Sequence, residues 1–428
     1  MFYRQHHHRC PRDLSNMQSN YYSWRKLAGT LHLWLGMSSG LVIVILGITG
    51  CLYVFIDELR PIVYRDRIFI QAPQHSQGTP LQQQRVPLHV LRKTADAALG
   101  SKIPLLDAEV YPDKLHTVVF RYRERNNAAN WYPNYFISYF RVYLNPFTGT
   151  VVKVENSKWE FFNLVVMLHC CLLLGHLGTQ IITWSTIIFM LMLLSGIILW
   201  WPKNRAAAKK RFAFNWKKQT SWKRKNYDMH QIPGFYSFII AFFIALTGLA
   251  MLLPKVDYAI KYVVSGGTFK GSKSGTQGHH TVGNNYADTS NPGVTDRALS
   301  QSLTLDPTAL KYRIYPAKNH SDALKIKTFK AHSRHQPERL LSFNQHTAAL
   351  LQNKAYSSLA TEDKLDDLYY DIHVGALLSL PGKILAFMVS LITATLPVSG
   401  FLIWKARKKQ KTLKNVASSP NQSLVLSS

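Results

Sequence analysis

The chain has 428 residues, of which 47% are hydrophobic, and its formal net charge is +28 at pH 7. This length is sufficient for several domains, but the hydrophobic content alone does not separate a globular protein from a membrane protein. The positive charge is concentrated beside long apolar segments, in residues 1–31, 202–229 and 405–428. That placement is typical of the cytoplasmic flanks of membrane helices and argues against nucleic-acid binding.

Four long apolar segments follow one another along the chain, at residues 31–55, 179–201, 234–253 and 384–404. Each is about as long as a helix that crosses ~30 Å of hydrocarbon, so we predict four transmembrane helices. The first segment is not followed by a small-residue cleavage site. We therefore expect an uncleaved membrane anchor rather than a signal peptide.

The basic flanks also set the orientation of the predicted helices. Because Lys and Arg gather on the cytoplasmic side of membrane proteins, we expect both termini and the loop at 202–229 in the cytoplasm. The segments at 56–168 and 254–372 then lie outside the cytoplasm. Each is long enough for a small domain.

The chain contains a twofold internal repeat that aligns without gaps in its membrane segments. In the first register, matched positions are His32 and His230, Gly36 and Gly234, Thr49 and Thr247, and Gly50 and Gly248. In the second, they are His169 and His373, Gly178 and Gly382, Ser195 and Ser399, Gly196 and Gly400, and Trp200 and Trp404. Matched helices run in the same direction, which predicts a parallel repeat about an axis along the membrane normal.

The outer segments also match each other. Residues 142–152, "VYLNPFTGTVV", have the pattern of a strand, a turn and a second strand, and residues 341–351, "LSFNQHTAALL", are their counterpart. Ala348 stands where the first turn has Gly149, so we expect the second turn to adopt a positive φ less easily.

A helical pattern at 87–99 and an alternating strand pattern at 115–123 precede the first hairpin. We therefore expect each outer segment to form a small α+β unit. The polar stretch at 265–293 is rich in Gly, Ser, Asn and Thr and predicts a flexible loop.

Several motifs together resemble those of the PepSY-associated transmembrane family, and the resemblance extends from Trp24 to Lys408. They are "WRKLAGTLHLWLG", "GITGCLYVF", "VYLNPFTGTVV" and "LSGIILWW" followed by a basic loop. This family includes iron-regulated inner-membrane proteins and FoxB-type ferric-siderophore reductases. The resemblance implies a mainly α membrane protein of the bacterial inner membrane, with four transmembrane helices, two periplasmic PepSY-like α+β domains and two b-type haems.

Together, the residues and the resemblance define an expected domain organisation. The first half comprises a cytoplasmic tail at 1–25, a first transmembrane helix at 26–55, a periplasmic PepSY-like domain at 56–160, and a periplasmic-side helix with the second transmembrane helix at 161–201. A basic cytoplasmic loop at 202–229 follows. The second half comprises the third transmembrane helix at 230–253, a second periplasmic PepSY-like domain at 254–364, a periplasmic-side helix with the fourth transmembrane helix at 365–404, and a basic cytoplasmic tail at 405–428.

Four histidines are the candidate site residues. The repeat places His32 and His230 at one membrane depth and His169 and His373 at another. A haem with two imidazole ligands needs two neutral rings at one level on facing helices, so each pair is a candidate set of axial iron ligands. A lone histidine near a helix end is more often an interfacial anchor, and pairing by symmetry is what favours ligation.

Other aromatic and glycine positions complete this interpretation. Gly36 and Gly40 follow His32 on one helix face and leave room for a flat macrocycle. His176 is a second-choice ligand, seven residues after His169 and therefore on a similar face of one helix. We interpret Trp200, with Trp201 and Trp404, as part of the interfacial aromatic belts.

Two haem sites at two depths predict a path for electrons across the membrane. The resemblance implies that the acceptor is a ferric siderophore or another ferric chelate, reduced on the periplasmic side. No dinucleotide-binding motif is present, so the donor is a separate quinol or cytoplasmic reductase. Asp57 and Glu58 are possible helpers near the substrate, or solvated interfacial charges. The alternatives are a non-enzymatic PepSY protein that binds peptide or regulates a partner, and a transporter.

Overall fold

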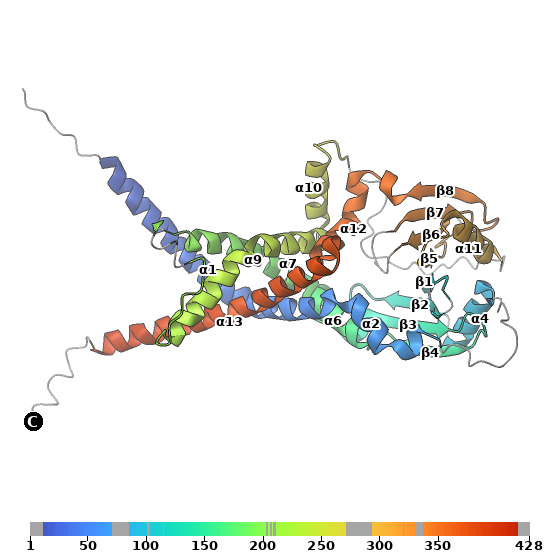
Figure 1. The fold of residues 1–428 in the computed structure, drawn as a ribbon, viewed down its shortest axis with the longest axis horizontal. Helices are drawn as coiled ribbons and strands as arrows, with labels where there is room; N and C mark the ends of the chain where they lie inside the picture. The colour runs from blue at the N-terminus through green and yellow to red at the C-terminus, as the bar shows by residue number, and fades with distance from the viewer. Residues whose placement is uncertain are drawn as a thin grey trace, which may run out of the picture. The chain divides into compact units, whose positions relative to one another are not determined.

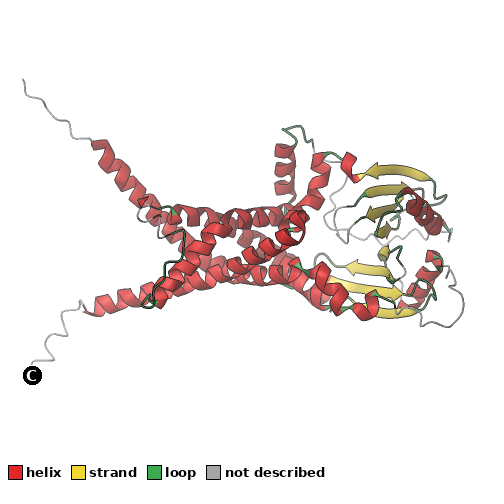
Figure 2. Ribbon diagram, in the orientation of Figure 1, coloured by secondary structure: helices red, strands yellow, loops and turns green. Residues whose placement is uncertain are grey.

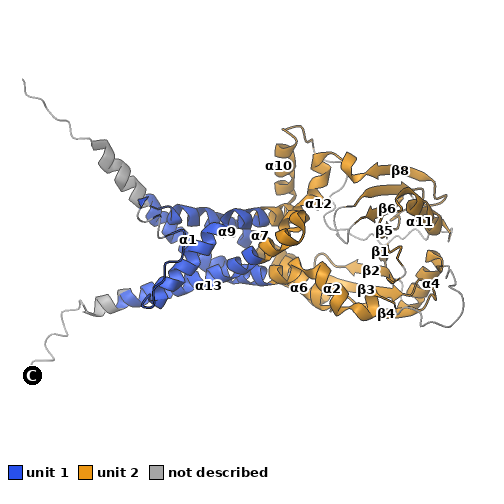
Figure 3. Cartoon of the chain, viewed as in Figure 1, with its two compact units in different colours: residues 1–48, 184–245, 388–428 blue, residues 49–183, 246–387 orange. Residues whose placement is uncertain are grey.

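The structure is a computed structural model. It describes residues 12–70, 85–100, 103–113, 115–202, 204–205, 208, 211–270, 293–319, 321–330 and 337–417. The chain divides into two compact units, drawn in different colours in Figure 3: Met1–Ile48, Trp184–Ala245 and Met388–Ser428 form unit 1, and Thr49–Thr183 and Leu246–Phe387 form unit 2. Most of the loop predicted at 265–293 lies outside the described residues.

Long helices dominate the helical part of the chain (Figure 2). They are α1 (Arg12–Val54), α7 (Gly175–Trp200), α9 (Trp222–Leu252) and α13 (Ser379–Ala417). Within the described residues, four helical stretches are long and apolar enough to cross a membrane: Trp24–Val54, Gly175–Trp200, Trp222–Leu252 and Ala376–Gln410. The four predicted transmembrane helices are therefore confirmed by length and composition. A helix suits this environment because it satisfies its backbone hydrogen bonds internally.

Small residues allow the helices of unit 1 to pack closely. A Cβ atom added to Gly47 on α1 would lie 2.8 Å from the Cβ of Ala394 and 2.8 Å from the carbonyl oxygen of Ser390, both on α13. Large apolar side chains such as Leu41 and Ile239 are exposed on the outer surfaces of these helices. This combination is typical of membrane helices, which pack through small residues and present apolar ones to lipid.

Shorter helices connect the long ones. They are α2 (Ile56–Val63), α3 (Arg65–Ile68), α4 (Leu88–Leu99), α5 (Tyr132–Tyr135), α6 (Phe161–Cys171), α10 (Pro254–Val264), α11 (Val294–Leu305), α12 (Thr361–His373), and the 3₁₀ turns η1 (Tyr356–Ser358) and η2 (Ala376–Leu378). α4 confirms the helix predicted at 87–99, and Gly100 ends it with a φ of 64°.

Unit 2 contains one antiparallel sheet of eight strands in the order β4-β3-β2-β1-β5-β6-β7-β8 (Figure 1). The strands are β1 (Leu105–Val110), β2 (Val118–Arg125), β3 (Phe136–Leu144), β4 (Val151–Asn156), β5 (Lys311–Tyr315), β6 (Leu324–Phe329), β7 (Arg339–Phe343) and β8 (Leu350–Ala355). Two separate sheets would leave β1 and β5 as exposed edges. Pairing β1 with β5 removes both edges and joins all eight strands.

One face of the sheet packs against α4 and α11 and forms the largest hydrophobic core. Its fully buried members include Phe120, Tyr122, Tyr312, Ile326 and Phe343. Alternate residues of β2, β3, β5, β6 and β7 point to this face, as the period of two requires. The opposite face carries charged residues that include Arg121, Arg141 and Arg313.

Asp296 on α11 connects the two halves of this core. Its carboxylate caps α4 by accepting hydrogen bonds from the backbone of Leu88 and His89, at 2.5 and 3.3 Å. The same carboxylate lies 2.7 Å from Nδ1 of His89. An N-terminal cap of this kind satisfies backbone donors that the helix itself leaves unpaired.

Both predicted hairpins are confirmed, and their turns use the same bonds. Asn145 and Asn344 each accept the backbone N–H four residues on, from Gly149 and from Ala348, at 2.9 Å in both turns. The φ of Gly149 is 73°, and that of Ala348 is 61°. Ala348 therefore keeps the left-handed conformation despite its Cβ, because the hydrogen bonds of the turn fix the backbone there.

Candidate functional site

The structure brings His32 on α1 and His230 on α9 together inside unit 1. Their ring centroids are 6.3 Å apart and the ring planes are nearly perpendicular, at 88°. A serine hydroxyl from another helix contacts each ring. The Oγ atom of Ser195 on α7 lies 2.9 Å from Nδ1 of His32, and that of Ser399 on α13 lies 2.9 Å from Nδ1 of His230.

The hydrogen bonds of His230 determine which ring nitrogen carries the proton. Its Nδ1 atom also lies 3.1 Å from the carbonyl oxygen of Leu396, which can only accept. The hydroxyl of Ser399 donates to carbonyl oxygens of its own helix, at 3.0 Å from Thr395 and from Leu396. Its oxygen therefore accepts from Nδ1–H. In the neutral ring this leaves the lone pair on Nε2, the nitrogen that a metal would bind.

The cavity beside this pair has a volume of about 490 Å³. Both histidines line it, and so do glycines from all four long helices: Gly29, Gly36, Gly40, Gly196, Gly234 and Gly400. A Cβ atom at Gly196 would touch Cε1 of His32 at 3.5 Å, and one at Gly400 would touch Cε1 of His230 at 3.4 Å. The glycines thus give the rings and the cavity their space.

Basic and aromatic side chains border the same cavity. Arg25, Arg211 and Arg407 line it together with Trp200, whose indole stacks on Phe235 at 3.8 Å between centroids. The interpretation of Trp200 as an interfacial belt residue is wrong, because its side chain is buried in unit 1. Its Nε1 donor is buried and has no acceptor among the described residues. A flat apolar group bearing carboxylates would fill the cavity and satisfy this donor.

A second pair, His169 and His373, lies in unit 2. His169 is in the last turn of α6 and His373 ends α12, and their ring centroids are 6.0 Å apart at an interplanar angle of 75°. Threonine hydroxyls replace the serines. Oγ1 of Thr49 lies 2.9 Å from Nδ1 of His169, and Oγ1 of Thr247 lies 3.3 Å from Nδ1 of His373.

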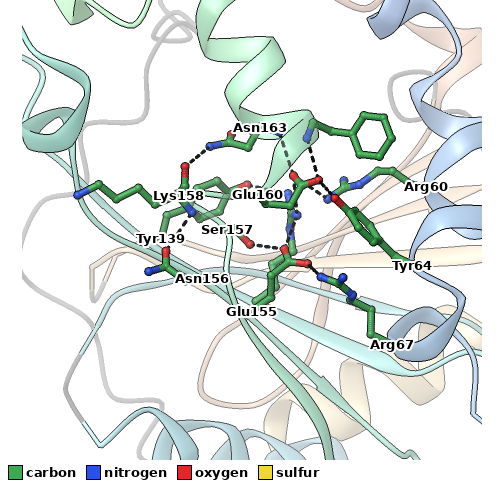
Figure 4. Close-up of polar contacts among 12 residues, drawn as sticks. Arg60, Tyr64, Arg67, Tyr139, Glu155, Asn156, Ser157, Lys158, Glu160 and Asn163 are labelled. Carbon is green, nitrogen blue, oxygen red and sulfur yellow. Dashed lines mark hydrogen bonds and ion pairs between the residues drawn. The ribbon is translucent and has the colours of Figure 1, made fainter.

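A buried carboxylate fixes the start of α6, the helix that carries His169 (Figure 4). Glu160 caps α6 by accepting the backbone N–H groups of Phe162 and Asn163, each at 2.9 Å. The phenol of Tyr64 donates to the same carboxylate at 2.5 Å. Burial, and then this neighbouring carboxylate, raise the pKa of Tyr64, so the phenol stays protonated and remains a donor.

A second carboxylate continues this network onto the sheet. Glu155 on β4 accepts from Arg141 on β3 at 2.9 Å and from Arg67 on α3. Burial alone would raise the pKa of Glu155, but the charge of Arg141 and the hydrogen bond from Ser157 outweigh burial and lower it. The network therefore ties α3 to the edge of the sheet from which α6 departs.

The chain turns sharply between α6 and α7. Leu172, Leu173 and Gly175 all have positive φ values, of 49°, 57° and 56°. The turn folds back over α7, and a Cβ atom at Gly178 would lie 1.7 Å from the carbonyl oxygen of Cys171. Only glycine fits at that position.

The segment after α12 has an equivalent close approach. A Cβ atom at Gly382 would lie 2.2 Å from the carbonyl oxygen of Gly375, whose own φ is 75°. The glycines that matched in the sequence repeat therefore mark two similar crossings of the backbone. Each crossing follows one of the paired histidines directly.

In a comparison with protein families, residues 30–407 match the model described as the PepSY-associated TM region. The chain belongs to this family. A comparison with curated proteins gives no match.

In this PepSY-associated transmembrane protein, the secondary candidates are His176, Asp57 and Glu58. His176 is exposed and belongs to α7, so the turn after α6 separates it from the helix face of His169. The idea that both lie on one helix face is wrong. Asp57 and Glu58 form the first turn of α2, and Glu58 pairs with Lys383 at 2.7 Å.

The hydroxyl partners of the histidines are candidate site residues that the sequence did not assign. Thr49, Thr247, Ser195 and Ser399 all appeared as matched positions of the repeat, each next to a glycine. The available signal for these partners was that a hydroxyl residue, like each histidine, stands at the same position in both halves of the repeat. In a helix it indicates a hydrogen bond to a neighbouring element as readily as one to its own backbone, so spacing alone did not decide its role.

Proposed function

We propose that this protein is a dihaem electron carrier of the bacterial inner membrane that reduces a ferric chelate, such as a ferric siderophore, on the periplasmic side. His32 and His230 would hold one b-type haem, and His169 and His373 the other. The observation that carries this proposal is the shared geometry of the pairs. Every ring is held through Nδ1 by a hydroxyl, and the two rings of each pair face each other at about the same separation.

That separation fits two imidazoles bound to one metal. With each nitrogen about 2 Å from a metal between them, ring centroids are roughly 6 Å apart. The centroid distances of 6.3 and 6.0 Å agree with this value. Among the described residues, no group of three or more His, Cys, Asp or Glu could hold a bare ion. A pair of histidines suits a macrocycle that brings four ligands of its own.

The internal repeat supplies one histidine of each pair from each half of the chain. In the first half, α1 carries His32 and Thr49, and in the second, α9 carries His230 and Thr247. The order of α4 and β1–β4 recurs as α11 and β5–β8, in keeping with two PepSY-like domains. Each proposed haem site would therefore need both halves.

The protein's own contribution is to orient the histidine rings and to enclose the cofactor. A bound haem supplies a centre that gains and loses one electron. The hydroxyls contact Nδ1 of each ring and would fix its orientation, and partners that accept from Nδ1–H raise the basicity of a metal-bound imidazole. The indole of Trp200 and the guanidinium of Arg407 border the inner cavity, where they would meet carboxylates of the cofactor.

The net reaction adds one electron to Fe(III) in a chelate outside the membrane. Hard oxygen ligands bind Fe(III) more tightly than Fe(II), so reduction loosens the metal. The basic flanks favour a position of the His32–His230 pair near the cytoplasm, where a quinol or a soluble reductase would deliver electrons. A separate donor is proposed because the sequence has no dinucleotide-binding motif.

A visible spectrum of the detergent-purified protein tests the proposal. Oxidised and dithionite-reduced samples should give the Soret and α bands of six-coordinate b-type haem, with a stoichiometry of two haems per chain. His230→Ala and His169→Ala should each remove one haem. A folded protein that stays colourless when produced with ample haem supply would refute the proposal and favour a binding or regulatory role.

A further inference from the structure

The charged face of the sheet, opposite α4 and α11, carries a line of arginines on β2. Phe120 and Tyr122 point into the core, and Arg121, Arg123 and Arg125 flank them in sequence on the other face. A β-bulge lies just before Arg125. All three guanidinium groups are partly buried.

Neighbouring arginines on this face have carboxylate partners. Arg121 donates twice to Asp107, at 2.6 Å in both bonds. Arg313 on β5 donates to Glu109 at 2.5 Å. These pairs are nearly enclosed, since the side chain of Asp107 is only 3% exposed. Charges buried in this way need such partners.

Arg123 and Arg125 are different. Within the described part of the chain, neither forms an ion pair, and the Nε atom of each is fully buried with no acceptor within hydrogen-bonding distance. Arg125 stacks over Phe136, with its guanidinium carbon 5.3 Å from the ring centroid. Stacking of this kind offsets only part of the cost of removing a guanidinium from water.

The surroundings confirm an excess of positive charge. Burial, followed by the charges of Arg125 and Arg121, lowers the pKa of Arg123 to about 10. Tyr139 on β3 lies directly opposite Arg123 in the sheet. Its burial would raise its pKa, but Arg141 and then Arg121 and Arg123 lower it to about 8. Both shifts have the direction expected where an anion would be stabilised.

This positive region adjoins the helix that carries His169. Phe136 and Tyr139 belong to a hydrophobic cluster with Leu164 and Met167 of α6. His169 follows Met167 by two residues on that helix. A ligand held at the arginines would therefore lie beside the helix that carries His169.

We propose that Arg123, Arg125 and Tyr139 form a binding site for an anionic oxygen group, and that this group belongs to a negatively charged ferric chelate. The inference rests on the proposed function for the identity of the metal. Carboxylate, phosphate and catecholate oxygens all match the planar donor set of a guanidinium. The same chemistry would fit the carboxylates of a haem, so the experiment separates these sources.

The test measures binding of a gallium(III) tris(catecholate), which is anionic and cannot be reduced under the conditions of the assay. Calorimetric titration of the full-length detergent-purified protein compares the wild type with Arg123→Gln, Arg125→Gln and the double variant. Loss of each charge-assisted contact should weaken binding about tenfold. Binding should also weaken as salt is added. An uncharged gallium trihydroxamate should bind weakly and respond little to the substitutions.

Two controls keep the result interpretable. Arg92→Gln removes a guanidinium that pairs with Asp96 on α4, on the other face of the sheet, and should leave binding unchanged. Arg123→Gln removes an unpaired buried charge, so the variant should unfold at the same temperature as the wild type or higher. Arg125→Lys keeps the charge without the planar fork and should bind with intermediate affinity.

The inference is overturned if the double variant binds the anionic chelate as tightly as the wild type. It is also overturned if the substitutions lower haem content while leaving chelate binding intact, since the arginines would then serve a haem carboxylate. Because gallium is not reduced, binding is scored without electron transfer. If a colourless protein binds the anionic gallium chelate and this binding depends on the arginines, the binding site is supported. The proposed dihaem reductase function is then refuted.

Discussion

The close approach of two backbone segments at Gly178 gives the sharpest test of how the structure positions His169. In Gly178→Ala the new Cβ would lie 1.7 Å from the carbonyl oxygen of Cys171, and contacts below 3.0 Å are not found in real structures. The two atoms must therefore separate by at least the difference, 1.3 Å. Because Cys171 ends α6, a shift of this size at its end moves His169 as well.

The expected cost has two parts. Forcing a methyl group into a filled space costs about 1–3 kcal/mol. A shift of the same size stretches the 2.9 Å contact between Thr49 and His169 beyond hydrogen-bonding distance, which removes about 1 kcal/mol more. We expect a loss of about 3 kcal/mol in the free energy of unfolding. The thermal midpoint in detergent should fall by roughly 3 °C.

Gly29→Ala is the matched control, on α1. Its new Cβ would meet only Cδ2 of Leu199, at the ordinary distance of 3.8 Å. Alanine favours a helix over glycine by about 1 kcal/mol, so this variant should be as stable as the wild type or more stable. In Gly178→Ala the haem proposed for His169 and His373 should be lost or its spectrum altered, while the one proposed for His32 and His230 remains. Equal thermal midpoints and equal visible spectra for Gly178→Ala and the wild type would refute the close contact between Gly178 and Cys171.

Three further predictions concern the histidine partners, a turn and a buried acid. Ser195→Ala and Ser399→Ala should each weaken haem binding at the inner site about 10–100-fold, measured by haem titration, whereas Ser→Thr should preserve it; unchanged affinity in both alanine variants would exclude a positioning role. Gly149→Ala should lower the free energy of unfolding by about 1 kcal/mol because the φ of 73° disfavours a side chain, and chemical denaturation that detects no loss would contradict this. Burial raises the pKa of Asp367 to about 6 from 3.8, so its protonated form is favoured in the folded state and stability should fall as pH rises from about 4 to 6. Asp367→Asn should remove this loss and raise the thermal midpoint at pH 7.5, and a lower midpoint would show that the charged form is needed.

The membrane helices and the histidine pairs could be predicted because their signals are local or repeated. A long apolar run specifies a spanning helix without knowledge of its neighbours. The register of the repeat placed His32 with His230 before any contact was known. Turns with Asn145 and Asn344 at matched positions were similarly readable from the sequence.

The remaining features depend on contacts between distant segments. The sheet is continuous because β1 pairs with β5, and no local pattern specifies which two edges meet. The turn after α6 uses positive φ at Leu172 and Leu173, residue types that do not mark a turn, so His176 was assigned to the wrong helix. Only the structure reveals that the Nε atoms of Arg123 and Arg125 have no acceptor among the described residues, because acceptors on this face come from strands that are distant in sequence.

The pairing of β1 with β5 has a consequence for any attempt to divide the molecule. Antiparallel contact between corresponding strands is also how two identical polypeptides join across a dyad. A polypeptide truncated before α9 would expose the unpaired edge of β1. It would also contain only one imidazole of each pair, from His32 and from His169. Such a fragment would regain its missing neighbours by self-association, so homodimers rather than inert monomers are the expected product of cutting the gene in two.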